Sequence, residues 1–317
     1  MKNVLVIHYS QTGQLSEVVH KLCAPLEAAE GIALHQLALR PQQDYPFPWP
    51  LLDFVDTFPE TVYHEPRPLQ PWQLPEGVEF DLVILAYQVW FLSPAQPITA
   101  FLQSSQGKAL LKDKPVVTVI ACRNMWLMAQ EQVKQLLTQA GARLLDNVAL
   151  VDQGSSLLTF ITTPRWMLTG NKGRPGGWLP VAGLSEQTIG RASRFGQALV
   201  AALDRDEERG PGPLLHGLEA AVVDIRLIPS ERIGRRSFMI WGKLLRRLGP
   251  PGTAARRVAL RAYIVFLLTL IITVVPMSML LRTLLRPLLR RKLMAQKAYF
   301  EQPSGSGTQR MATFTHD

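Results

Sequence analysis

The stretch Val4-Leu5-Val6-Ile7-His8-Tyr9-Ser10-Gln11-Thr12-Gly13-Gln14-Leu15-Ser16 decides the fold. Its first half, residues 4–9, is a short apolar and β-branched run, which is typical of a parallel strand buried on both faces. Residues 10–14 form a small polar loop with one glycine, and apolar residues then recur at helical spacing as far as residue 29. This order of strand, loop and helix predicts an anion site, because the free N–H groups of the first helical turn point into the loop.

The loop has no cation of its own. No Lys or Arg lies between Asn3 and His20, so a phosphate bound here would be held by the hydroxyls of Ser10 and Thr12 and by backbone N–H groups. The loop lacks the Gly-Lys-Ser/Thr ending of a P-loop and the three-glycine dinucleotide fingerprint. An ordinary strand, turn and helix with a hydroxyl cap is the alternative interpretation.

Composition bounds the class of protein. The chain has 317 residues, enough for one substantial domain with an extension, and a net charge of +9 that is concentrated toward the C-terminus. Its two cysteines, Cys23 and Cys122, are too few for a disulfide framework and indicate a reducing compartment. The sequence shows no metal-ligand cluster and no signal peptide at its start, so we expect the catalytic part in the cytoplasm.

Further strands are expected at residues 32–39, 81–87, 115–121 and 144–151, with helices at 98–103, 127–140 and 184–203. Five strands that alternate with helices predict an α/β fold with a doubly wound, five-stranded parallel sheet. Ligands of such sheets bind at the carboxyl ends of the strands. The loops at residues 10–14, 88–92 and 122–126 would meet there.

Three segments interrupt this pattern. Residues 40–77 combine nine prolines with aromatic residues, and we interpret this insert as a lid over the core, an apolar wall beside a ligand, or both. Residues 152–183 are expected to be a long loop, either a functional lid or disordered. Residues 205–213 are interpreted as a linker.

The remainder of the chain predicts membrane association. Residues 262–281 carry no charge, and a helix of that length spans roughly 30 Å, one bilayer core. Arginines flank it densely, which favours anionic headgroups over a buried helix. Nucleic-acid binding by these arginines is a further alternative, but the aliphatic residues interleaved with them favour a membrane. We expect a basic, membrane-associated helical region over residues 214–300, anchored through 262–281 to the cytoplasmic face of the inner membrane, and a disordered tail over 301–317. Whether 262–281 spans or dips into the bilayer is left open.

Two loops resemble a known family. Ser10, Thr12 and Gly13 match the flavodoxin phosphate loop, Ser/Thr-x-Thr-Gly-x-Thr, whose final Thr is replaced by Leu15. Residues 88–97 resemble the isoalloxazine loop of flavodoxin-like NAD(P)H:quinone reductases, although Gln88 stands for the usual proline and Leu92 for the usual glycine. The resemblance implies a flavodoxin-like FMN-binding domain over residues 1–204. The cofactor-binding residues that it implies are Ser10, Gln11, Thr12, Gly13, Gln14, Leu15, Gln88, Val89, Trp90, Phe91, Leu92, Cys122, Arg123 and Asn124.

Four of these residues have more specific expectations. The flat rings of Trp90 and Phe91 would stack on the flavin, or else fill a hinge. Arg123 and Asn124 are the candidate catalytic residues, as partners of the flavin's pyrimidine edge or of a substrate oxygen, with a surface salt bridge as the alternative for Arg123. Cys122 is expected to be a small apolar residue rather than a nucleophile.

The composite of this domain with a basic, hydrophobic tail resembles the bacterial dialkylresorcinol "condensing enzyme" family. That resemblance implies an FMN-dependent dehydrogenase, or aromatase, that converts a lipid-like dialkyl cyclohexanedione to a dialkylresorcinol. It also implies a ketosynthase-like partner enzyme and an anionic membrane surface, with no nucleic acid, and it leaves a homo-oligomer open. The alternatives are an NAD(P)H:quinone reductase of the same fold and a non-enzymatic membrane adaptor that has lost FMN.

Overall fold

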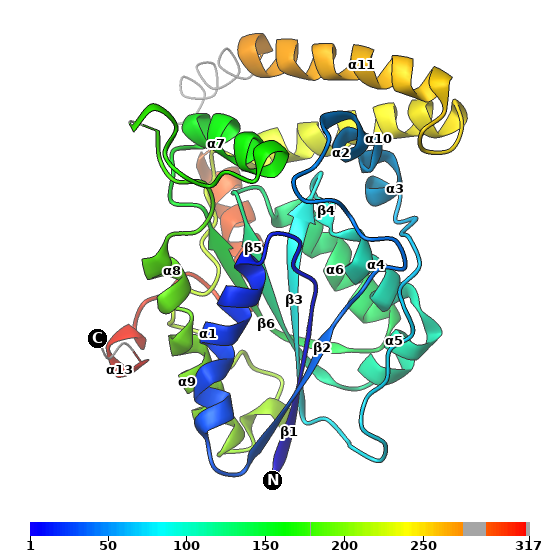
Figure 1. Ribbon diagram of the computed structural model, residues 1–317. Coiled ribbons are helices and arrows are strands. Elements are labelled where there is room, and N and C mark those ends of the chain that lie inside the picture. Colours follow the sequence, from blue (N-terminus) through cyan, green and yellow to red (C-terminus); the bar gives the residue numbers. More distant parts are fainter. Residues whose placement is uncertain (178, 275–289, 315–317) are drawn as a thin grey trace.

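A computed structural model describes residues 1–177, 179–274 and 290–314 of the protein (Figure 1). Its centre is a sheet of five parallel strands in the order β2-β1-β3-β5-β6. The strands are β1 (Lys2–His8), β2 (Ile32–Ala38), β3 (Leu82–Trp90), β5 (Pro115–Cys122) and β6 (Arg143–Val151), and the two residues of β4 (Ser93–Pro94) pair antiparallel with β3. This strand order is that of the flavodoxin-like fold, as expected from the sequence.

The sheet is buried on both faces because its side chains alternate between two apolar layers. Leu5 and Ile7 of β1 belong to one hydrophobic core and Val4 and Val6 to the other, and all four side chains are fully buried. The helices α4 (Gln96–Gln103), α5 (Ser105–Leu111) and α6 (Leu127–Gln139) cover the first layer, and α1 (Gln14–Ala28), α8 (Glu186–Gly190) and α9 (Ser193–Leu203) cover the second (Figure 1).

Five helices lie over the carboxyl ends of the strands. They are α2 (Leu51–Asp56) and α3 (Phe58–Val62) from the proline-rich insert, α7 (Ser156–Thr169), α10 (Ile228–Arg247) and α11 (Ala254–Thr269), drawn at the top of Figure 1. The insert packs on the core, as expected of a lid, since Tyr45 and Trp49 are buried in the first core. Phe54 lines a cavity at the strand ends, and the role of the insert as a wall beside a ligand stays a prediction. The long loop expected over 152–183 is wrong in its centre, where α7 forms.

The chain after residue 204 is part of the domain rather than joined to it by a free linker. Lys2 forms ion pairs with Asp206 and Glu208, which fasten the segment 205–213 to β1. Residues 214–223 then follow β6, where Ala149 N–H donates to the Ala220 carbonyl at 2.8 Å. The side chains of Leu214, Leu215 and Leu218 are buried in the second core, so the strand edge is covered.

The expected disorder of residues 301–317 is wrong for 301–314, and residues 315–317 lie outside the described part. Ser304 Oγ donates to the buried Asp146 carboxylate and accepts from Asn147 N–H, both at 2.7 Å. The same carboxylate accepts the backbone N–H groups of Leu214 and Leu215, at 2.7 and 3.1 Å. Burial nevertheless outweighs these bonds and raises the pKa of Asp146 to about 6. One carboxylate of β6 therefore holds two C-terminal segments.

The helix expected over 184–203 is interrupted. The structure has α8, then a break at residues 191–192, then α9. The predicted anchor, 262–281, is described only as far as residue 274: α11 and a π-helical turn over Leu270–Val274. Within the residues that the structure describes, no helix combines the length and the apolar character needed to cross a bilayer.

Candidate flavin site

Residues of the three predicted loops meet at one cavity of about 230 Å³ at the carboxyl ends of β1, β3 and β5, although residues 88–90 belong to β3 and not to a loop. Its lining comprises Gln11, Thr12, Gln14, Leu15, Phe54, Gln88, Val89, Trp90, Phe91, Ala121, Cys122, Arg123, Asp152, Thr163, Trp166, Met167 and Gly183. Ten of the predicted site residues are in this lining. Ser10 and Gly13 belong to the same loop without lining the cavity, Leu92 lies in the adjacent hairpin, and Asn124 faces elsewhere.

The loop after β1 has the features of an anion site. Gly13 takes a left-handed conformation (φ +84°) and precedes α1, and no side chain caps that helix. Ser10 Oγ is buried without a hydrogen-bond partner among the described residues, although buried hydroxyls nearly always have one. Gln14 is engaged differently: its side chain forms two hydrogen bonds with the backbone of Leu184, so it positions the loop.

The loop after β3 is a strained hairpin. Trp90 pairs with Ser93, so Phe91 and Leu92 are the two turn residues, and their φ values are +51° and +60°. Such a turn favours Gly or Asn, and a bulky residue costs on the order of 1–3 kcal/mol at each position. Leu92, at a position where the resemblance expects glycine, thus takes a backbone conformation that favours glycine. The turn is held by Gln132 Nε2, which donates to the Leu92 carbonyl at 2.9 Å, and by Arg235, which donates to Ser93 Oγ at 2.7 Å.

The two aromatic rings of this hairpin form one wall of the cavity. Trp90 packs edge-on against Tyr9, Tyr45 and Trp49, with ring centroids 4.9–5.9 Å apart. Phe91 packs in a tilted arrangement on Phe54, at 4.8 Å. Because Tyr45, Trp49 and Phe54 belong to the proline-rich insert, the insert fixes the orientation of the rings that face the cavity.

Arg123 supplies a half-buried cation. Its guanidinium donates to Thr159 Oγ1 at 3.4 Å and lies 4.0 Å from the centroid of the Phe160 ring, both on α7. Burial lowers the pKa of Arg123 to about 10, and Cys122 and Asp152 only partly oppose this. The group stays charged at neutral pH and therefore favours an anionic or strongly electron-rich ligand atom. The surface salt bridge considered for Arg123 is wrong, because the side chain is inside the site.

Cys122 and Asp152 complete this end of the cavity. Burial raises the pKa of the Cys122 thiol, so the thiol stays protonated and is unsuited to act as a nucleophile, as expected. Asp152 accepts the N–H groups of Gly154 and Gly183, at 2.7 and 2.9 Å, and burial raises the pKa of its carboxyl. Asp152 therefore orders the two segments on either side of α7.

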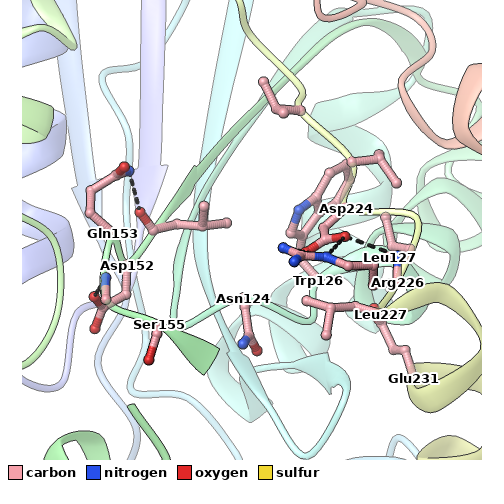
Figure 2. Close-up of a pocket in the computed structure, with 14 residues that line it drawn as sticks. Asn124, Trp126, Leu127, Asp152, Gln153, Ser155, Asp224, Arg226, Leu227 and Glu231 are labelled. Atoms are coloured by element: carbon pink, nitrogen blue, oxygen red, sulfur yellow. Dashed lines mark hydrogen bonds and ion pairs between the residues drawn. The ribbon is translucent and has the colours of Figure 1, made fainter. Parts of the chain in front are cut away.

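Asn124 lines a second cavity, of about 290 Å³ (Figure 2). Trp126, Asp224 and Glu231 also line it, and Figure 2 shows Asp224 paired with Arg226 at one side. Glu231 is 1% exposed and accepts the N–H of Met128 at 2.6 Å. The placement of Asn124 in the flavin site is therefore not reproduced, and Asp152 is the residue that both cavities share.

A further part of the cavity lining was not predicted from the sequence. It is formed by Thr163, Trp166 and Met167 of α7. Two signals could have indicated this helix: Ser155, whose Oγ accepts the Leu158 N–H as an N-terminal cap, and Gly170, which ends the helix in a left-handed conformation. No cluster of three or more His, Cys, Asp or Glu suited to a metal occurs in the described residues.

Solved structures of flavodoxin-like proteins are similar to this chain in fold. A flavoprotein from Lactobacillus acidophilus, in complex with FMN, shares 14% identity over 46% of this chain and 92% of its own, with a TM-score of 0.37. A flavodoxin from the domain Archaea shares 7% identity over 64% and 99%, with a TM-score of 0.35. Flavodoxin 1 from Bacillus cereus shares 11% over 54% and 99%, with a TM-score of 0.28.

No protein-family model and no curated protein matches the sequence. The class of protein therefore rests on the strand order and on the site at the strand ends. They define a flavodoxin-like α/β protein with a C-terminal helical extension.

Proposed function

We propose that the protein binds FMN in the cavity at the carboxyl ends of β1, β3 and β5. The observation that carries this proposal is the coincidence, in one loop beside this cavity, of an uncapped helix N-terminus with an unpartnered buried hydroxyl at Ser10. Both features suit a phosphate, which would accept from backbone N–H groups and from the hydroxyls of Ser10 and Thr12. The FMN-bound flavoprotein among the similar structures supports the same ligand.

The flavin ring would lie between the hairpin residues Trp90 and Phe91 and the α7 residues Trp166 and Met167. Arg123 would meet the electron-rich oxygens of the ring's pyrimidine edge. The cavity volume of about 230 Å³ is below the usual range for ligand pockets, about 300–1,000 Å³.

FMN, when bound, supplies the acceptor or donor of a hydride. The residues of this chain supply position and a dry environment. The aromatic walls exclude water from the ring, and the Arg123 cation favours extra negative charge on it. We therefore propose an FMN-dependent oxidoreductase.

We propose further that the reaction is the dehydrogenation of a dialkyl cyclohexanedione to a dialkylresorcinol. An apolar substrate is supported by the aromatic walls and by the apolar residues exposed on α10 and α11 beside the site. The competing function is reduction of quinones by NAD(P)H. Anaerobic mixing separates the two: loss of flavin absorbance with a cyclohexanedione supports the dehydrogenase, and fast bleaching by NAD(P)H alone supports the reductase.

A further inference from the structure

The helices α10 and α11 expose an unusual number of large apolar side chains. They account for most of the exposed large hydrophobic residues after residue 222. The set is Ile233, Ile240, Leu244, Leu248, Val258, Val265, Phe266 and Leu268, continued by Ile272 in the π-helical turn. Ile240 and Ile272 are 70% and 72% exposed, which is too open for residues at the margin of a core.

The same surface is basic. Its exposed cations are Arg232, Arg236, Lys243, Arg247, Arg257 and Arg261. The sole acidic residue between positions 228 and 274 is Glu231, and it is buried. Apolar and cationic side chains together, with no exposed carboxylate within residues 228–274, match the interface of an anionic phospholipid layer, where acyl chains lie beneath negative headgroups. An acidic protein partner would form ion pairs with the cations but would not bury the exposed isoleucine side chains. A second copy of this chain would place like charges together.

The inner faces of the two helices are fixed to the domain. Arg256 is fully buried and pairs with Asp56 at 2.5 Å and with Glu60 at 2.6 Å. Leu260 and Tyr263 pack with residues of α2 and α3 in a third hydrophobic cluster. The helix pair therefore lies across the end of the sheet, as Figure 1 shows, with one face used for the fold and the other open.

A series of aromatic contacts joins the inner face of α11 to the flavin cavity. Tyr263 contacts Phe58 with ring centroids 4.8 Å apart, and Phe58 contacts Phe91 at 5.7 Å. Phe91 is itself in the cavity wall. The open helix face and the cavity thus lie at the same end of the molecule.

We propose that α10 and α11 dock flat on an anionic phospholipid surface, with the carboxyl end of the sheet toward the lipid. Docking in this orientation requires no membrane-spanning helix. It brings the cavity to the place where a long-chain substrate partitions, and this second part alone rests on the proposed function.

The test is co-sedimentation of the full chain with phosphatidylcholine vesicles, with and without phosphatidylglycerol. We expect binding that increases with phosphatidylglycerol. The combined change Arg236→Gln, Arg257→Gln and Arg261→Gln should weaken it at least tenfold at low salt, since each cation near the surface contributes roughly fivefold. The pair Lys21→Gln and Lys112→Gln, exposed cations on other elements, is the control and should change it little.

A second variant tests the apolar part. Ile240→Ser, Val265→Ser and Ile272→Ser together should reduce the binding that remains at high salt, whereas Val181→Ser, an exposed valine outside these helices, should not. Wild-type protein that ignores phosphatidylglycerol vesicles, or variants that bind as tightly as wild type, would overturn the proposal. If the wild type self-associates without binding vesicles, and the serine variant loses that self-association, the face belongs to an interface with a second copy of this chain. Flavin content measured on the same samples keeps this result separate from the FMN proposal. If the wild type docks on the vesicles but the variants show no selective loss of turnover on long-chain substrate, only the substrate-delivery part of the proposal is rejected.

Discussion

The backbone N–H of Gln11 donates a hydrogen bond to Gln88 Oε1 at 3.2 Å, which joins the loop after β1 to the end of β3. Gln11 Nε2 also donates to the Pro46 carbonyl at 2.9 Å, so the proline-rich insert is tied to the same point. Three segments distant in sequence are thereby held together by hydrogen bonds within the protein. Preorganisation of this kind lowers the entropic cost of binding at the site.

The phosphate loop is tested by Thr12→Asp. The new carboxylate would repel a phosphate in a loop that contains no Lys or Arg of its own, so we expect FMN affinity to fall by at least a hundredfold while the fold survives. Gln135→Asp, which adds the same charge at an exposed position of α6, is the matched control. Titration of flavin-free protein with FMN, followed by circular dichroism, gives both quantities. Equal FMN affinity in Thr12→Asp and Gln135→Asp would place the phosphate elsewhere.

The role of Arg123 is tested by Arg123→Leu and Arg123→Lys. A half-buried cation beside the ring favours the reduced flavin, which carries more negative charge, so its loss should make the midpoint potential more negative and weaken FMN binding by roughly tenfold. The lysine variant keeps the charge and should retain part of both effects. Spectroelectrochemistry of the bound flavin measures the potential. If the midpoint potential of Arg123→Leu equals that of the wild type, the guanidinium does not lie beside the flavin.

The packing of α1 on α9 depends on Gly196. A Cβ on this residue would lie 1.9 Å from the Leu22 carbonyl oxygen, a backbone atom that cannot turn aside. Gly196→Ala should therefore lower the free energy of unfolding by about 1–3 kcal/mol or more. Gly190→Ala, where no atom lies within 4 Å of the new methyl group, should be neutral or slightly stabilising. Chemical denaturation of both variants makes the comparison, and equal losses would contradict the close helix contact.

Glu231 should make stability depend on pH. Burial raises the pKa of its carboxyl from 4.5 to about 8, so the folded protein retains a proton that the unfolded chain releases. This contribution is complete below about pH 4.5 and is lost as the pH rises toward 8, at no more than about 1.4 kcal/mol per pH unit. Glu231→Gln keeps an acceptor for Met128 N–H and should flatten the slope between pH 6.5 and 8. Parallel slopes for the two proteins in denaturant titrations would show that Glu231 does not titrate there.

The sheet could be predicted because each strand carries its own signal. Residues 4–9 and 82–87 are continuous apolar runs, and their alternate side chains fill two layers, as buried parallel strands require. The loops at their ends were located for the same reason, since parallel strands bring their carboxyl ends to one edge. Gly13 and the hairpin at Phe91–Leu92 then appear where the motif places them.

The C-terminal half could not be predicted in this way, because its residues are organised by contacts distant in sequence. Leu214 and Leu215 appeared to begin a membrane region, yet Asp146 of β6 binds their N–H groups and draws them into the core. Arg256 lies in a basic segment, but two carboxylates of the insert bury it. A protein truncated at residue 209, before these segments, would therefore lose part of its hydrophobic core. For this reason the membrane proposal is better tested by surface substitutions than by truncation.

The most direct measurement of the central claim is the absorption spectrum of the purified full-length protein between about 350 and 500 nm, followed by release and identification of the bound cofactor. The account predicts the two absorption bands of an oxidised flavin and the release of FMN in about one equivalent per chain. A colourless protein that also fails to take up added FMN would contradict it.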